Sequence, residues 1–315
     1  MIITVTPNPS IDRTIAVDDL RAGQVHRATS SRIDPGGKGI NVSRALTAQD
    51  SPTLALAPLG GPEGHLLGEL LATAGVAHRP IDVGGSVRMN VAVVEPNGTT
   101  TKLNEPGPVL SDGEAQALLA ATADAAVGAT WVLGSGSLPP GAPTNWYADL
   151  VAAARDRGTR VAIDSSGAPM AAALAACPTL IKPNLDELAE LVGRPLTVLG
   201  EVVDAAYELV EEGIALVYVS LGADGAIVVG NDVLAYARAT ITAPLSSVGA
   251  GDCLLAGVLD ALAHGADPVG ALRQGVLWGA AAVTLPGSRV PTPEDLIGIP
   301  VQVDAHLDRS LALAG

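Results

Sequence analysis

The chain has 315 residues, of which 48% are hydrophobic and 16% are charged, and its formal net charge at pH 7 is −15. This length and composition predict a folded globular protein with one large core and exclude a disordered chain. The negative charge and the aromatic content of only 2% argue against nucleic acid or an anionic membrane as a partner.

Two further features narrow the class of protein. Cys177 and Cys253 provide neither a disulfide framework nor a metal-ligand spacing. Residues 1–5 lack the basic start and the long apolar run of a secretory signal, and no apolar segment long enough to span a membrane follows. We therefore expect a cytoplasmic enzyme.

Strand and helix patterns alternate along most of the chain. Residues 2–6 form an apolar run ended by prolines, which predicts a buried strand. A helix is expected over residues 38–49 and a short strand over 53–57. After residue 110, the predicted helices cover 114–126, 144–155, a segment near Asp186, and 202–211, and the predicted strands cover 130–134, 160–164, a segment near Leu180, and 215–220. This alternation indicates right-handed crossovers and a largely parallel sheet with helices on both faces.

Two regions, residues 11–33 and 86–104, interrupt this alternation. The first lacks helical periodicity, and the second has two extended stretches on either side of Pro96-Asn97-Gly98, a strong hairpin signal. We interpret both regions as one small sheet outside the main domain, with ordinary surface hairpins as the alternative. Such a sheet would expose an apolar face of a kind that monomers usually avoid, which favours a homodimer formed through it.

The most informative motif is Ser-Ser-Val-Gly-Ala-Gly-Asp-Cys at residues 246–253, directly before the apolar run 254–259. Its small residues expose backbone amides at a predicted helix start, where anions bind. Asp252 lies in the first turn, where a carboxylate can accept a proton from a hydroxyl while the amides hold a phosphoryl group. An ordinary glycine turn, with Asp252 as a first-turn acid, is the alternative.

A second glycine motif, residues 34–46, also leads into a predicted helix. It is not a Walker A loop, because Lys38 is followed by glycine and not by serine or threonine. The first motif is not a dinucleotide fingerprint, because Leu254 occupies the third glycine position. Two anion-binding helix starts about 200 residues apart indicate one site that holds two phosphorylated ligands.

The ordered set of motifs resembles that of the ribokinase/PfkB family of carbohydrate kinases. The matching segments are residues 4–12, 36–42, 136–141, 182–188, 220–225 and 248–252. Each segment is a weak signal, but their order is specific and the resemblance covers nearly the whole chain. It implies a ribokinase-like three-layer α/β/α fold, with one kinase domain over residues 1–315. The small sheet is then a lid, formed by about residues 11–33 and 86–104, that closes on the sugar.

The resemblance also implies an activity, namely the ATP-dependent phosphorylation of D-fructose 1-phosphate to D-fructose 1,6-bisphosphate. Tagatose 6-phosphate and fructose 6-phosphate are the alternative acceptors within the family. A sugar-phosphate sensor without catalytic activity is the alternative from a different class, and the intact Asp252 motif argues against it. An unphosphorylated sugar is disfavoured because Lys38 and Arg88, the expected phosphate contacts, would lack an anionic partner.

Roles for single residues follow from the family motifs, position by position. Asp252 is expected to be the catalytic base, and the amides of Gly249, Ala250 and Gly251 to stabilise the transferring phosphoryl group. The residues expected to bind the sugar phosphate are Asp12, Arg27, Gly36, Gly37, Lys38, Asn41, Arg88, Asn90 and Ser137. Those expected to bind ATP are Lys182, Asn184, Ser220, Gly222, Gly225, Ser247, Gly249 and Gly251.

Three of these assignments have specific alternatives. Asn184 and Glu187 are expected to organise Mg²⁺ through water, but the same pair also fits a capping box at a helix start. A solvated edge-strand charge is an equal alternative for Arg27. Cys253 stands where the family usually has serine; we interpret it as a buried small residue, with an oxidisable thiol as the alternative.

Overall fold

The apolar run at the start of the chain forms β1 (Ile2–Val5), and all four of its residues are buried. In this computed structural model, which describes residues 1–313, β1 belongs to a sheet of ten strands in the order β14-β13-β12-β11-β10-β9-β8-β1-β4-β5. The other nine strands are β4 (Thr53–Pro58), β5 (His78–Ile81), β8 (Trp131–Ser135), β9 (Arg160–Asp164), β10 (Leu180–Ile181), β11 (Leu216–Ser220), β12 (Ala226–Gly230), β13 (Val233–Ala239) and β14 (Val301–Asp304). Strands β11 to β5 in this order pair in parallel, and β12, β13 and β14 add an antiparallel edge.

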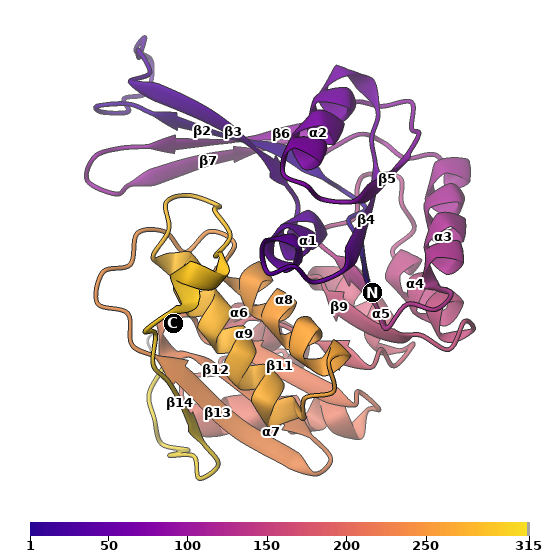
Figure 1. Ribbon diagram of the computed structural model, residues 1–315, viewed down its shortest axis with the longest axis vertical. Helices are drawn as coiled ribbons and strands as arrows, with labels where there is room; N and C mark the ends of the chain where they lie inside the picture. The colour runs from indigo at the N-terminus through magenta and orange to yellow at the C-terminus, as the bar shows by residue number, and fades with distance from the viewer. Residues whose placement is uncertain (314–315) are drawn as a thin grey trace.

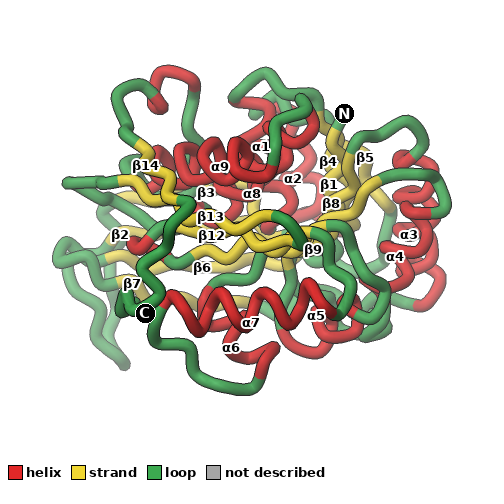
Figure 2. Tube along the Cα trace, turned by 90° about the horizontal axis from the view of Figure 1, so that it is seen from below, coloured by secondary structure: helices red, strands yellow, loops and turns green. Residues whose placement is uncertain are grey.

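Helices cover both faces of this sheet, as Figure 2 shows. One face carries α1 (Lys38–Ala48), α2 (Gly61–Thr73), α8 (Ala250–Ala263) and α9 (Pro268–Val283). The other carries α3 (Asp112–Ala126), α4 (Trp146–Arg155), α5 (Gly167–Leu174), α6 (Leu185–Val192) and α7 (Leu199–Glu211). Side chains alternate along β1, so Ile3 packs in the core beneath α3 to α7, whereas Ile2 packs in the core beneath α1, α8 and α9.

A second sheet of four strands, in the order β3-β2-β6-β7, projects from this body (Figure 1). Its strands are β2 (Ser10–Ala16), β3 (Ser30–Gly36), β6 (Arg88–Val94) and β7 (Thr100–Asn104). We call this sheet the lid sheet. The chain enters it directly after β1 and leaves it through Gly37 into α1. The lid sheet is therefore joined to the two elements that begin the main domain.

The structure confirms the predicted α/β architecture, the largely parallel sheet and the additional small sheet. The patterns did not predict β5, α2, α5, α9 or the antiparallel edge. Strands β12 and β13 are joined by Asn231 and Asp232 alone, and so short a connection requires an antiparallel pair. Within residues 1–313, no helix combines the length and apolar character needed to cross a membrane.

Candidate active site

The glycine-rich motif near the C-terminus forms the start of α8. Gly249 is the N-cap and has a left-handed backbone, with φ of 79°, which glycine adopts without strain. Asp252 lies in the first turn and is only 8% exposed. The amides of Gly251 and Asp252 precede the first hydrogen bond that closes a helical turn, so the helix offers them no partner. The amide of Ala250 donates to the Ser247 carbonyl oxygen at 3.3 Å.

The carboxylate of Asp252 is held by a residue of the other glycine motif. Asn41 of α1 donates from Nδ2 to Asp252 Oδ2 at 2.8 Å. The pKa of Asp252 is raised to about 6, mainly by burial and further by the charge of Asp164. The hydrogen bond from Asn41 and the ammonium groups of Lys38 and Lys182 lower this pKa, but they do not outweigh burial. A carboxylate with this pKa is mostly ionised at neutral pH and can still accept a proton. The two glycine motifs therefore meet at one site.

Two lysines converge on a second buried carboxylate beside this site. Asp164, the last residue of β9, is fully buried; its Oδ1 accepts a hydrogen bond from Lys38 Nζ at 2.9 Å, and its Oδ2 lies 3.4 Å from Lys182 Nζ. Burial disfavours the charged form of Asp164, but the charges of Lys182 and Lys38 outweigh it, so the pKa of Asp164 is lowered. Burial also disfavours the charge on Lys38, but Asp164 and Glu187 outweigh it and raise the pKa of Lys38. Asp164 and Lys38 are therefore both charged at neutral pH.

Lys182 brings positive charge to the start of α8. Its side chain is 4% exposed, and its ammonium nitrogen would lie 3.7 Å from a Cβ placed on Gly251. Free amides, the positive end of a helix dipole and an ammonium group together attract an anion. A phosphoryl group bound here would lie next to Asp252.

The lid sheet contributes a second polar cluster. Asp12 of β2 lies opposite Asn90 of β6, and Asp12 Oδ1 accepts hydrogen bonds from Ser10 Oγ at 2.7 Å and Asn90 Nδ2 at 3.1 Å. In the described part of the chain, no residue donates to Asp12 Oδ2, and Asn90 Oδ1 is buried without a partner. Two oxygens that face no protein donor suit the hydroxyl groups of a sugar.

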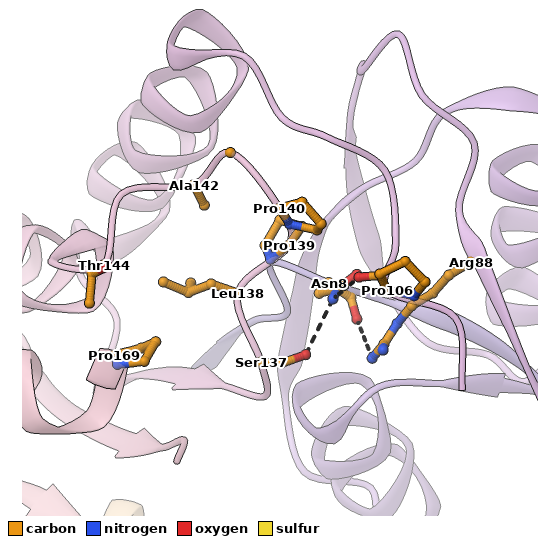
Figure 3. Close-up of a pocket in the computed structure, with 11 residues that line it drawn as sticks. Asn8, Arg88, Pro106, Ser137, Leu138, Pro139, Pro140, Ala142, Thr144 and Pro169 are labelled. Atoms are coloured by element: carbon orange, nitrogen blue, oxygen red, sulfur yellow. Dashed lines mark hydrogen bonds between the residues drawn. The ribbon is translucent and has the colours of Figure 1, made fainter. Parts of the chain in front are cut away.

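Arg88, the first residue of β6, lines a cavity of about 500 Å³. Figure 3 shows Arg88, Asn8 and Ser137 gathered at one end of this cavity. Arg88 donates from Nη1 to the Glu105 carbonyl oxygen at 3.0 Å and from Nη2 to that of Asn8 at 3.1 Å. Asn8 Nδ2 donates to Ser137 Oγ at 3.2 Å.

The carboxylates of Asp12 and Glu105 lie near enough to favour the charge of this guanidinium, but neither forms an ion pair with it. Burial lowers the pKa of Arg88, its Nε is buried without a partner, and none of the described carboxylates forms an ion pair with it. A half-buried guanidinium of this kind, on the wall of a cavity, suits a phosphate.

Asn184 and Glu187 form the capping box that their spacing predicts at the start of α6. Glu187 N–H donates to Asn184 Oδ1 at 2.8 Å, and Asn184 N–H donates to Glu187 Oε2 at 2.9 Å. The other carboxylate oxygen, Oε1, accepts from Lys38 at 3.3 Å. Within residues 1–313, no group of three or more His, Cys, Asp or Glu side chains has an arrangement that could hold a metal. The oxygens of Asn184 and Glu187 are of the kind that a hydrated Mg²⁺ carried by substrate phosphates prefers, and Glu187 would be a carboxylate beside such an ion.

Comparison with known proteins agrees with this geometry. A family model described as pfkB family carbohydrate kinase matches residues 6–295. The chain belongs to this family. It is therefore a sugar kinase, an enzyme that transfers a phosphoryl group to an alcohol group, and the expected ribokinase-like fold is confirmed.

Relatives of this pfkB kinase match it over most of its length. The 1-phosphofructokinase of Rhodobacter capsulatus is 37% identical over 300 residues, which is 95% of each chain. That of Xanthomonas campestris pv. campestris is 42% identical and covers 82% of this chain and 83% of its own. Phosphofructokinase-2 of Escherichia coli, solved with fructose-6-phosphate, has a TM-score of 0.88 at 33% identity and covers 94% of this chain and 96% of its own. A tetrameric inhibited form of that protein has also been solved.

The remaining residues predicted to bind ATP lie near the carboxyl ends of the parallel strands, where open α/β sheets bind ligands. Ser220 ends β11 and forms an isolated parallel bridge with Asn184, so the segments that follow β10 and β11 lie side by side. Gly222 begins the short 3₁₀ helix Gly222–Asp224, and Gly225 follows it with φ of 98°. Their contact with ATP, and that of the exposed Ser247, stays a prediction.

The structure separates the cations predicted to hold the sugar phosphate. Lys38 contacts Asp164 and Glu187, and Arg88 contacts neither of them. Arg27 lies exposed in the loop between β2 and β3, so its predicted place on a strand is wrong. Of the three cations, Arg88 alone lines the cavity.

Sequence analysis did not identify Asp164 or Asn8 as site residues. Asp164 ends the predicted strand 160–164, and a carboxylate at the carboxyl end of a parallel strand was a usable signal. Its partner Lys38 is 126 residues away, so the ion pair itself was not predictable. Asn8 follows β1 in the same way, but it lies between Pro7 and Pro9, where an asparagine is equally typical of a turn.

Proposed function

We propose that this kinase transfers the terminal phosphoryl group of ATP to D-fructose 1-phosphate and releases D-fructose 1,6-bisphosphate and ADP. The observation that carries the proposal is the buried Asp252 carboxylate at the start of α8, beside free amides and the ammonium group of Lys182. This arrangement provides a proton acceptor and an anion site next to each other, as phosphoryl transfer to a hydroxyl requires. The 1-phosphofructokinases of Rhodobacter capsulatus and Xanthomonas campestris, two of several such relatives, support fructose 1-phosphate as the acceptor.

Binding of the sugar is divided between the cavity and the lid sheet. Arg88, with Asn8 and Ser137 beside it, binds the phosphate that the sugar already carries. Asp12 and Asn90 accept hydrogen bonds from the sugar hydroxyls through their free oxygens. This positions the remaining primary hydroxyl toward α8.

Transfer then occurs in one displacement. Asp252 accepts the proton of the acceptor hydroxyl while the hydroxyl oxygen forms a bond to the γ-phosphorus. The bond between that phosphorus and the oxygen of ADP breaks in the same step, so no phosphoenzyme forms. The amides of Gly249 and Gly251, together with Lys182, stabilise the charge on the transferring group.

Mg²⁺ enters this proposal with the phosphates of ATP. Glu187, with Asn184 next to it, is the residue that fits such an ion through water, and the ion would neutralise charge on the phosphates. The hydrogen bond from Lys38 holds the Glu187 carboxylate at that place. We also propose that the enzyme acts in the cytoplasm, where ATP and sugar phosphates are available.

Fructose 6-phosphate is the second candidate acceptor, because the E. coli structure that contains this sugar is 33% identical to the chain. Arg88 would bind its phosphate in the same cavity, and tagatose 6-phosphate would bind likewise. A sensor without catalytic activity needs no proton acceptor, so the buried and hydrogen-bonded Asp252 favours an enzyme over that alternative.

Release of ADP with Mg-ATP and four acceptors tests the proposed function. The acceptors are fructose 1-phosphate, fructose 6-phosphate, tagatose 6-phosphate and free fructose. We expect kcat/KM for fructose 1-phosphate to exceed the others at least ~100-fold, about 2.7 kcal/mol of discrimination in the transition state. A preference for a 6-phosphate would overturn the assigned acceptor, and absence of turnover with all four would overturn the proposed function.

We further propose that the enzyme forms a homodimer through the lid sheet. In the strand register, Ile33, Val91 and Leu103 lie in one row across the sheet, on the face opposite Asp12 and Asn90. The exposed Arg13 of β2 stands in this row between Ile33 and Val91. Ile33 is 36% exposed and Leu103 is 62% exposed. The same face of a second copy is the partner that would cover this row symmetrically.

A further inference from the structure

Arg44 places a half-buried guanidinium near the site. Arg44 of α1 lies three residues after Asn41, which places the two side chains on the same face of the helix. Arg44 Nη1 donates to Asn41 Oδ1 at 3.1 Å and to the Pro35 carbonyl oxygen at 3.3 Å. Asn41 in turn donates to Asp252 Oδ2 at 2.8 Å. These contacts form a continuous chain from the guanidinium to the carboxylate.

We propose that Arg44 is a positioning residue for Asp252, because it fixes the amide of Asn41 with its NH₂ group toward the carboxylate. The inference rests on the proposed role of Asp252 as the base. A guanidinium only donates hydrogen bonds, so the Asn41 oxygen must face Arg44 and the amide nitrogen must face Asp252. Without Arg44, the amide is free to rotate and to present its oxygen to the carboxylate, where two acceptors repel.

No other charged group nearby replaces this contact. The titratable groups that face Arg44 are Asp34 and Arg32 of β3, Asp12 of β2, and Cys253 of α8. Those that face Asp252 are Asp164 of β9, Lys38 of α1, and Lys182 after β10. Among the described residues, Arg44 alone donates to Asn41 Oδ1.

The contact has a consequence for the pH dependence of the reaction. The hydrogen bond from Asn41 lowers the pKa of Asp252, so its loss would raise that pKa further. Asp252 would then stay protonated to a higher pH, and the acid limb of kcat/KM would move upward. A structural role of Arg44, limited to holding the Pro35 carbonyl, would leave the acid limb in place.

The test compares Arg44→Gln with Arg44→Lys, since both keep a polar side chain but only lysine is restricted to donating hydrogen bonds. With Mg-ATP and the acceptor that the wild type uses, we expect R44Q to lower kcat roughly 10-fold at pH 6.5, a part of what a positioned base contributes. KM for both substrates should change less than ~2-fold, and the acid limb should move to higher pH. R44K should restore the wild-type limb and part of kcat.

Arg160→Met is the matched control, because Arg160 stacks on Trp131 at 4.5 Å, at the end of β9 opposite Asp164. It should keep the wild-type kcat and acid limb. A titration of the Asp252 carboxyl by ¹³C NMR in the ligand-free protein provides a readout that does not need turnover. There, R44Q should raise the pKa of Asp252 and R44K should not.

Two outcomes separate the inference from the proposed function. Equal acid limbs and equal Asp252 titrations in R44Q, R44K and the wild type overturn the role of Arg44, whatever the effect on kcat. Near-normal turnover of Asp252→Asn would overturn the proposed role of Asp252 as the base. The proposed role of Arg44 would then be overturned as well, because it depends on that base.

Discussion

Small residues determine where the charged groups of this site lie. A Cβ at Gly36 would be 2.4 Å from the carboxyl carbon of Asp12, so β3 approaches Asp12 closely only because this residue is glycine. Gly37 is the N-cap of α1 with φ of 114°, and a Cβ there would be 2.7 Å from Thr6 Cγ2. The glycines that the sequence analysis placed in the sugar pocket therefore act by permitting close approach of the backbone.

Gly36→Ala should displace the Asp12 carboxylate and weaken binding of the sugar. We expect KM for the sugar phosphate to rise at least ~10-fold, because small shifts of positioning groups have large effects, while KM for ATP changes less than ~2-fold. Steady-state kinetics with each substrate varied in turn measures both. Gly113→Ala is the control, since no atom lies within 4 Å of its added Cβ in the first turn of α3. Equal KM values in G36A and the wild type would contradict the role of Asp12.

Cys253 lies buried in α8, next to Asp252. Its side chain is 1% exposed, and burial, with the charge of Asp252 adding to it, raises the pKa of the thiol to about 12. The thiolate is the reactive form of cysteine, so burial and the raised pKa both disfavour reaction of this thiol. The interpretation as a buried small residue is confirmed.

At the scale of elements, α1 connects the parts of the site. Lys38, Asn41 and Arg44 follow one another at intervals of three residues, so one helix face reaches Asp164, Asp252 and the lid strand β3. The start of α8 provides the matching acceptor, Asp252. Two helix starts built from glycine motifs thus bring together groups from distant parts of the chain.

Local patterns predicted these elements well, and the motifs also predicted that the two glycine turns share one site, but they did not predict the individual side-chain contacts between distant segments. The starts of α1 and α8 were predictable because glycine adopts the left-handed backbone that a tight turn before a helix requires. The hairpin of β6 and β7 was predictable because Asn97-Gly98 favours a tight turn. The placement of Lys38 was not predictable, because it depends on Asp164, which lies 126 residues away. The antiparallel edge was missed because β12 is as buried as a parallel strand, so its periodicity is no guide.

At the scale of the whole molecule, the lid sheet has one polar face and one mainly apolar face, which includes the exposed Arg13. If the apolar face forms a dimer, Leu103→Glu places a charge in the interface twice, once from each subunit. We expect light scattering to show a dimer for the wild type and at least ~10-fold weaker association for L103E, because burial of a leucine contributes about 1.5–3 kcal/mol. Val127→Glu, at a similarly exposed position after α3, should remain dimeric. A wild-type monomer at the concentration used for kinetics would contradict the proposed dimer.

The acidic surface is compatible with anionic substrates because cationic side chains are buried around the site. The net charge is −15, but Lys38, Lys182 and Arg88 are partly or fully buried around the site. Charges at short range in a site of low polarity outweigh distant surface charges, which solvent and salt screen. We therefore expect the site to bind phosphates in spite of the overall charge.

The most direct test of the account is the turnover of Asp252→Asn with fructose 1-phosphate and Mg-ATP, measured together with the affinity for fructose 1-phosphate by calorimetry. Because asparagine keeps the shape of the side chain but cannot accept the proton, we expect kcat to fall ~100- to 10,000-fold while Kd changes less than ~3-fold. A kcat within ~10-fold of the wild type would contradict Asp252 as the base.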